Sequence, residues 1–234
     1  MIQTLEAEGF LLRVPGADRV LLGPEFLRLA REGDAGMVLQ EVARGPLEEL
    51  SQMERETVTL SVVRADGQLD LIYQVDGPHH LVPRSWIGQR FALHASSSGK
   101  MLLSTYDEEQ LAKFFRQPLA AMAPATITTE RGLRRELARI RSQGYALTRD
   151  ELEEGLSGVS VAIGGDRPVP LATINLSGLT QRLSTSRLRD AADRMRIVAG
   201  DIGHALEPNG VPSVDHDGDG SPPAEPRNAG KRSS

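Results

Sequence analysis

The sequence contains no cysteine, which excludes disulfide bonds, thiolate metal sites and cysteine nucleophiles. It also has no apolar run long enough to span a bilayer, and its N-terminus lacks a signal-peptide pattern. An excess of positive charge is absent as well. The net charge of −5 argues against a chain that binds nucleic acid over its whole surface, although a small basic module at one end remains compatible with it. We therefore expect a cytoplasmic protein without a membrane partner.

Two sequence patterns of nucleotide-binding and hydrolytic proteins are missing too. A phosphate-binding loop needs a glycine where His94 stands and a serine or threonine where Met101 stands. No Gly-x-Ser-x-Gly nucleophile elbow is present, and the segment around Ser160 is predicted to be a strand rather than a strand-to-helix turn. We therefore predict that the chain is not an enzyme and holds neither a metal nor a cofactor.

The chain of 234 residues is long enough for one medium domain with appendages or for two small domains. Residues 1–9 are expected to form the end of a helix that stops at Gly9. Residues 10–13 and 19–22 then predict a hairpin around a Pro-Gly-Ala-Asp turn. A helix followed by a short hairpin is the second half of a winged helix-turn-helix, with Arg13 and Arg19 on the wing.

The helix of this motif begins at Met1, so we expect its first helix and the start of its recognition helix to be missing. Those residues supply most base contacts in such motifs. A misplaced start and a true loss of the DNA-reading half remain alternatives.

Residues 24–53 are helical in pattern, with apolar residues spaced by three and four. Gly33 and Gly36 are expected to divide this stretch into two helices, and Pro46 predicts a kink or a new helix start. Such a linker helix either pairs with a copy of itself or packs on the chain's own sheet, and both interpretations remain open.

The central region predicts antiparallel strands over 57–63 and 69–75, joined by an Asp66-Gly67 turn. A short extended piece through residues 80–82 follows. Further strands are expected from Tyr145 to Thr148, from 159 to 163 and from 169 to 177. The alternation of side chains places Thr173, Asn175 and Ser177 on one strand face, which is either solvent-exposed or lines a polar pocket.

Four helices are expected around these strands. The first begins at Ser96–Ser98, where serines cap the helix and, together with Lys100, suit a small anion. A plain cap is the alternative. The next has a capping box of Thr105 and Glu108. The third has Thr128 or Thr129 as its cap and Gly144 as its stop, and the last spans residues 184–206 with one apolar stripe.

Two polar segments complete the pattern. The acidic residues 150–155 lack the alternating ligand spacing of a calcium loop and predict a solvated loop. The tail from residue 207 to 234 is rich in Pro, Gly, Ser and Asp and is expected to be disordered.

In order and spacing, these motifs resemble the IclR family of bacterial transcriptional regulators over residues 1–206. The motifs are Leu5-Glu6-Ala7-Glu8-Gly9-Phe10, Leu22-Gly23-Pro24, Gly88, Leu93-His94-Ala95-Ser96-Ser97-Ser98-Gly99-Lys100, Gly144-Tyr145-Ala146, Glu151 to Gly155 and Asn175-Leu176-Ser177-Gly178. The resemblance implies an α+β fold: a GAF-like effector domain with a curved antiparallel sheet flanked by helices. A partial winged helix-turn-helix and a linker helix precede it.

The resemblance also implies the domains and the site. The expected parts are residues 1–23 (partial winged motif), 24–53 (linker and dimerisation helices), 54–206 (effector-binding domain) and 207–234 (tail). The effector-binding residues carried over from the family are Ser97, Ser98, Gly99, Thr148, Leu156, Gly158, Asn175 and Ser177. The residues expected at DNA are Gln3, Thr4, Arg13 and Arg19. Some family members have an acidic residue at position 148 and a cysteine at 158, so the effector here is expected to differ in size and polarity.

The sequence thus predicts a ligand-responsive regulator that binds operator DNA, senses a small organic acid or aromatic metabolite, and forms a homodimer or tetramer. A stand-alone dimeric effector-binding domain that no longer reads DNA is the alternative.

Overall fold

The computed structural model describes residues 2–8, 10–13, 20–22, 35–64, 66–79, 87, 92–164 and 169–206. The N-terminal elements are helix α1 (Ile2–Ala7) and strands β1 (Leu11–Arg13) and β2 (Val20–Leu22). The two strands pair antiparallel, with Leu12 opposite Leu21. Helix followed by hairpin is the order that the sequence predicts.

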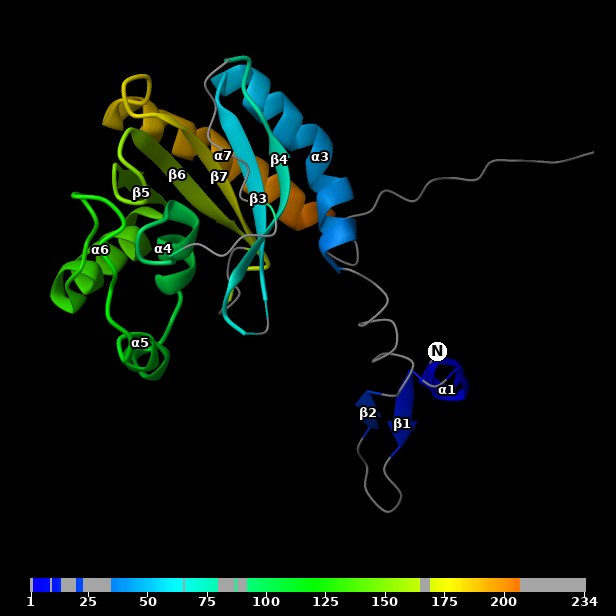
Figure 1. Ribbon diagram of the computed structural model, residues 1–234. Coiled ribbons are helices and arrows are strands. Elements are labelled where there is room, and N and C mark those ends of the chain that lie inside the picture. The colour runs from blue at the N-terminus through cyan, green and yellow to red at the C-terminus, as the bar shows by residue number, and fades with distance from the viewer. Residues whose placement is uncertain are drawn as a thin grey trace, which may run out of the picture.

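The larger part of the fold is built on a five-stranded antiparallel sheet in the order β4-β3-β7-β6-β5 (Figure 1). Its strands are β3 (Thr57–Val63), β4 (Leu69–Val75), β5 (Ala146–Arg149), β6 (Leu156–Ile163) and β7 (Ala172–Leu179). The α+β fold with an antiparallel sheet is therefore confirmed. β6 begins earlier than predicted, since Ser157 and Gly158 pair with both neighbouring strands.

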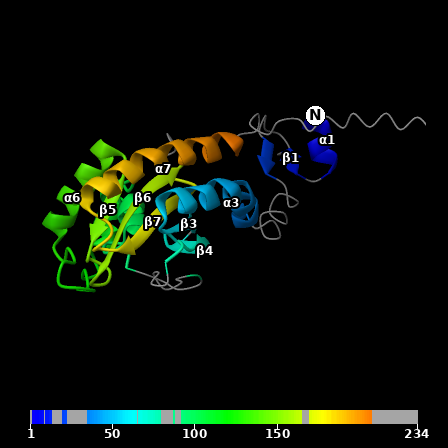
Figure 2. The ribbon, with the colours of Figure 1, turned by 90° about the horizontal axis from the view of Figure 1, so that it is seen from above.

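Two long helices cover one face of this sheet: α3 (Ala35–Glu54) and α7 (Thr185–Ala205), as Figure 2 shows. The apolar stripe predicted for the last helix is buried here, and Ser184 caps the N-terminus of this helix. The inner residues of α3, among them Ala43, Leu47 and Leu50, join the same core. The inner side of α3 thus packs on the chain's own sheet, whereas pairing of the linker with a copy of itself stays a prediction.

α3 runs without a break through Pro46. The new helix start that we considered at this proline is therefore wrong. Ala43 precedes the proline and Leu47 follows it, and both residues are fully buried against the sheet. This packing offsets the backbone hydrogen bond that proline removes. The predicted first half of the linker, residues 24–34, lies outside the described residues.

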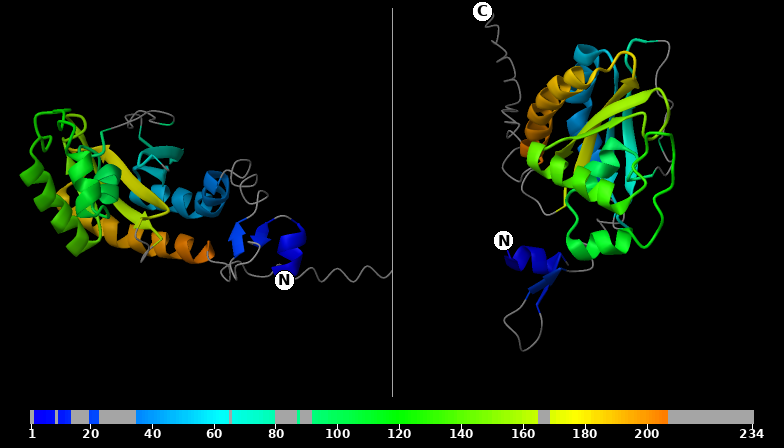
Figure 3. Two further views of the ribbon diagram at one scale, coloured as in Figure 1. Left: turned by 90° about the horizontal axis from the view of Figure 1, so that it is seen from below. Right: turned by 90° about the vertical axis from the view of Figure 1, so that its left-hand side faces the viewer.

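The opposite face of the sheet carries α4 (Ser97–Leu103), α5 (Glu108–Phe114) and α6 (Glu130–Gln143), which enclose a second apolar core (Figure 3). Thr129 caps α6, and Gly144 ends it with a φ of 78°, a left-handed conformation that favours glycine. The predicted capping box was placed two residues too early. Asp107 and Gln110 form it, because the Thr105 hydroxyl donates instead to the Leu102 carbonyl.

The joint between α3 and β3 is held by a buried carboxylate. Glu56 is 1% exposed, and its two oxygens accept hydrogen bonds from Arg182 at 2.8 and 2.7 Å. Arg187 lies 3.5 Å from the same carboxylate and also donates to the Glu54 backbone carbonyl at 2.6 Å. Arg194 pairs with the Glu54 side chain. These ion pairs fix the end of the linker helix to the last helix and to the end of β7.

We predict that Glu56→Gln lowers the free energy of unfolding by about 2 kcal/mol, because it weakens charge-assisted hydrogen bonds to a half-buried arginine. Urea denaturation measures the change. The matched control is Glu41→Gln, which removes an exposed carboxylate 3.5 Å from Arg44 and should change stability by less than about 0.5 kcal/mol. Equal effects of the two substitutions would contradict the structural role of Glu56.

Candidate functional site

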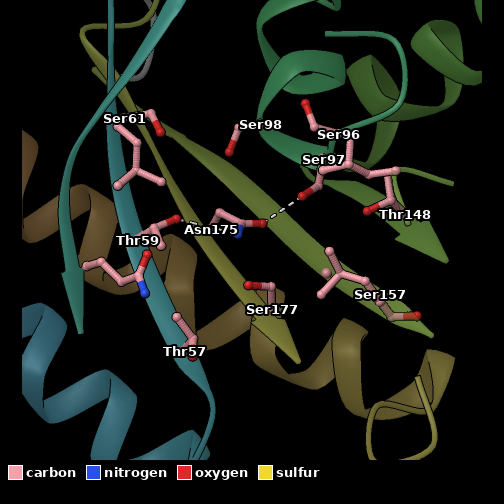
Figure 4. Close-up of a pocket in the computed structure, with 15 residues that line it drawn as sticks. Thr57, Thr59, Ser61, Ser96, Ser97, Ser98, Thr148, Ser157, Asn175 and Ser177 are labelled. Atoms are coloured by element: carbon pink, nitrogen blue, oxygen red, sulfur yellow. Dashed lines mark hydrogen bonds between the residues drawn. The ribbon is translucent and has the colours of Figure 1, made fainter. Parts of the chain in front are cut away.

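A polar cavity lies between α4 and the inner face of the sheet (Figure 4). Its volume is about 70 Å³. It is lined by Thr57, Thr59, Ser61, Leu71, Gln74, Ser96, Ser97, Ser98, Thr148, Leu152, Leu156, Ser157, Gly158, Asn175 and Ser177. Nine of these residues carry a hydroxyl, two carry an amide, and none carries a charge. Such a lining binds a small polar molecule through hydrogen bonds rather than ion pairs.

Asn175 occupies the centre of the cavity, where Figure 4 shows it between Thr59 and Ser97. Its Oδ1 accepts a hydrogen bond from the Ser97 hydroxyl at 2.6 Å. Its Nδ2 is 3.5 Å from the Thr59 hydroxyl, a long contact that leaves this amide group able to donate elsewhere. Asn175 therefore links α4 to the sheet and offers a donor to a bound molecule.

Gly158 makes room for this arrangement. A Cβ atom at position 158 would lie 2.9 Å from the Leu176 carbonyl and 3.2 Å from the Asn175 Oδ1. A larger side chain would therefore displace Asn175 or the neighbouring strand. Further into the same interface, the Ser98 and Ser160 hydroxyls are 3.2 Å apart, and Ser160 donates to the Ile174 carbonyl.

The start of α4 is capped as expected. The Ser96 hydroxyl accepts a hydrogen bond from the Gly99 N–H at 3.1 Å. Gly99 itself does not line the cavity; a Cβ there would overlap the backbone of Leu93. Gly99 thus lies outside the lining and lets α4 pack closely on the preceding turn, and its part in effector binding stays a prediction.

Lys100 does not face the cavity either. Its side chain is fully buried, and its Nζ pairs with the Glu151 carboxylate at 2.5 Å. Burial raises the pKa of Glu151 above its usual range, although the Lys100 ammonium acts against this shift. Thr126 donates to the Glu151 carbonyl and fixes the loop further. The interpretation of residues 150–155 as a merely solvated loop is corrected here, as is that of Lys100 as a cation for an anionic ligand.

Seven of the eight predicted effector residues thus line one cavity, and Gly99 is the exception. The sequence analysis missed five lining residues on β3 and β4: Thr57, Thr59, Ser61, Leu71 and Gln74. A signal for three of them was present. The alternation that places Val58 and Leu60 in the apolar core places Thr57, Thr59 and Ser61 together on the other face.

Three of the four residues predicted to contact DNA lie in the described N-terminal elements. Thr4 is exposed on α1. Gln3 belongs to α1 and Arg13 to β1, whereas Arg19 lies outside the described residues. The predicted extended piece at 80–82 and the predicted disordered tail at 207–234 also lie outside them.

The described residues were also compared with the requirements of a metal site and of a membrane span. No three His, Asp or Glu side chains there gather closely enough to hold a metal ion. Among the same residues, no helix combines the length and apolar character needed to cross a membrane. His94 is buried, and its Nε2 is 2.8 Å from the Ala120 carbonyl.

Comparison with known proteins identifies the family. The model of the domain described as "Bacterial transcriptional regulator IclR C-terminal" matches residues 35–204. The HTH-type transcriptional regulator Rv1719 of Mycobacterium tuberculosis is 34% identical over 165 residues, which are 70% of this chain and 62% of that protein. The chain therefore spans less than two thirds of this relative.

Solved structures agree with the fold. The crystal structure of the Thermotoga maritima IclR superposes with a TM-score of 0.67 at 27% identity, over 88% of this chain and 83% of that one. An IclR homolog of Microbacterium hydrocarbonoxydans, solved with 4-hydroxybenzoate, gives 0.62 at 26% identity, over 85% and 82%. The matched proteins are transcriptional regulators and not enzymes, as predicted. The chain belongs to the IclR family of bacterial transcriptional regulators.

Proposed function

We propose that this regulator is ligand-responsive, and that the cavity between α4 and the sheet binds its effector, a small organic acid or aromatic metabolite. The observation that carries this proposal is a cavity lining with nine hydroxyls and two amides. Fully buried sheet faces are usually apolar, because a buried polar group without a partner is destabilising. A polar inner face beside a cavity is therefore best explained by a polar occupant.

The size of the cavity narrows the effector class. A cavity of roughly 150 Å³ accommodates benzene in an engineered protein core. The cavity here measures about 70 Å³ and so favours a compact acid of a few carbon atoms over a ring in this conformation. The Microbacterium homolog holds the aromatic acid 4-hydroxybenzoate. An aromatic effector would require this cavity to widen.

The proposed effector contacts are Ser97, Ser98, Thr148, Leu156, Gly158, Asn175 and Ser177, with Gly99 acting through the packing of α4. The proposed domain division is residues 1–23, 24–53, 54–206 and 207–234, with a homodimer or tetramer formed through the linker. Gln3, Thr4, Arg13 and Arg19 would contact operator DNA. The helix and hairpin of residues 2–22 support this last assignment, because they match the second half of a winged motif.

A mobility-shift assay tests the DNA-binding part. We expect the chain to retard a DNA fragment carrying its operator, and we expect the effector to change the apparent affinity at least fivefold. A chain extended upstream in the open reading frame is the comparison. If only the extended chain retards the DNA, the present chain does not bind the operator, and the alternative of a stand-alone effector-binding domain would take the place of the proposal.

Asn175→Leu should weaken effector binding by about 10- to 100-fold, since it removes a hydrogen bond worth about 1.5–3 kcal/mol to a charged ligand. The measurement is a thermal-shift screen against small mono- and dicarboxylates and aromatic acids. A ligand that binds only the native state raises the melting temperature in a saturable way. Gln181→Leu is the control, because Gln181 is exposed and outside the lining.

A shift that persists unchanged in Asn175→Leu would show that the effector binds elsewhere. Absence of a shift with every acid would leave Ser96 as a plain helix cap and remove the support for a sensor of this class.

The Lys100–Glu151 pair should hold the loop that carries Leu152 over the cavity. We predict that Lys100→Met raises the pKa of Glu151 further, because the ammonium lowers it, and that Glu136→Gln lowers it, because the Glu136 charge raises it. Carboxyl ¹³C chemical shifts recorded against pH measure both changes. The two substitutions should move the midpoint in opposite directions, and a common direction would contradict this arrangement of charges.

A further inference from the structure

A second cavity lies beyond the start of α4 and shares no lining residue with the first. Its volume is about 220 Å³. It is lined by Gln68, Ala92, Leu93, His94, Phe114, Gln117, Pro118, Leu119 and Ala120. These residues come from the turn between β3 and β4, the turn before α4, and the end of α5 with the residues that follow it. In Figure 1 the tip of the β3–β4 hairpin and α5 lie at the same end of the domain.

The walls of this cavity are held by interactions of their own. The Tyr106 hydroxyl donates to the Gly67 carbonyl at 3.2 Å, next to Gln68, and so ties the hairpin turn to the segment between α4 and α5. His94 joins the turn before α4 to the segment after α5 through its contact with the Ala120 carbonyl. Hydrogen bonds therefore hold segments that line this cavity.

The His94 ring carries the chemical argument. The Ala120 oxygen can only accept, so the Nε2 atom 2.8 Å away donates, and the neutral ring then presents Nδ1 as an acceptor. Nδ1 has no hydrogen-bond partner among the described residues. Thr173 Oγ1 is the one polar side-chain atom of these residues that is buried without a partner, so Nδ1 is accessible to solvent. Water can therefore donate to Nδ1, and a ligand hydroxyl that donates in its place preserves this hydrogen bond.

The remaining lining determines what kind of molecule supplies that donor. Phe114, Leu93, Leu119 and Pro118 offer apolar surface, and Phe114 packs against the second core. Gln68 and Gln117 add amides. The cavity is open to solvent, and its volume of about 220 Å³ leaves space for one aromatic ring. A ring hydroxyl matches an acceptor nitrogen, whereas a carboxylate would oppose it.

We infer that this cavity is a second ligand site, which takes a small phenol whose hydroxyl donates to His94 Nδ1 and whose ring lies against Phe114. This inference does not depend on the proposed effector site. The first cavity is small, hydroxyl-lined and suited to a compact acid, whereas the second is larger, mostly apolar and suited to a neutral aromatic ring. The two sites therefore differ in ligand class.

The test uses the full chain labelled with ¹⁵N and phenol itself as the probe. We expect the His94 Nδ1 resonance to move with phenol in a saturable way, with half-saturation in roughly the millimolar range for so small a ligand. Anisole, which has the ring but no hydroxyl donor, should bind at least several-fold more weakly. Absence of a saturable change at His94 Nδ1 would overturn the inference, as would equal binding of the two compounds.

Two substitutions locate the binding. Ala120→Trp adds a large side chain to a residue that lines the cavity and should weaken phenol binding at least tenfold. Ala121→Trp, which is likewise at an exposed position but lies outside the lining, should not. Asn175→Leu should leave phenol binding unchanged. Loss of binding in Asn175→Leu would place phenol in the first cavity, and unchanged binding in Ala120→Trp would place it elsewhere, so either result would overturn the inference.

Discussion

The buried carboxylate of Glu56 determines how the parts of this fold meet. It stands between the end of α3 and the first residue of β3, and Arg182, which follows β7, binds both of its oxygens. Removal of a carboxylate from water is unfavourable unless donors replace the water, so this position needs the two arginines that approach it. Gly178 on β7 is part of the same constraint, since a Cβ there would overlap the Glu56 side chain.

This constraint has a consequence for the site. Thr57, which lines the first cavity, directly follows Glu56, and Ser177, which lines it too, pairs with Thr57 across the sheet. The ends of both cavity strands are thus fixed at the point where the linker helix ends. A shift of these strand ends would also displace the end of α3, because Arg187 and Arg194 bind Glu54, its last residue. The geometry joins the cavity to the helix that precedes it in the chain.

Much of the fold could be predicted because its signals are local. The period of two in β7 placed Asn175 and Ser177 on one face, and the spacing in the last helix gave its buried stripe. The capping box was misplaced by two residues because Thr105 and Asp107 both fit its pattern, and only the hydrogen bond of Thr105 to Leu102 separates them. Local rules therefore predict elements more securely than their ends.

The charged interactions could not be predicted in this way. Lys100 and Glu151 are 51 residues apart, and Glu56 and Arg182 are 126 apart, so no periodicity links them. Their pairing follows from topology: α4 lies beside β5 and β6, whose connecting loop carries Glu151. In the sequence, Lys100 close to three serines is typical of an anion site, and only the fold shows that Glu151 is its partner.

That pairing also explains the chemistry of the first cavity. With Lys100 neutralised by Glu151, the described lining has no net charge, and the hydroxyl of Ser97 already donates to Asn175. An acid that enters must therefore be held by hydroxyl and amide donors that change partners, with the Asn175 Nδ2 as the donor least engaged at 3.5 Å from Thr59. Discrimination among ligands would then depend on the positions of donors and on volume rather than on attraction between charges.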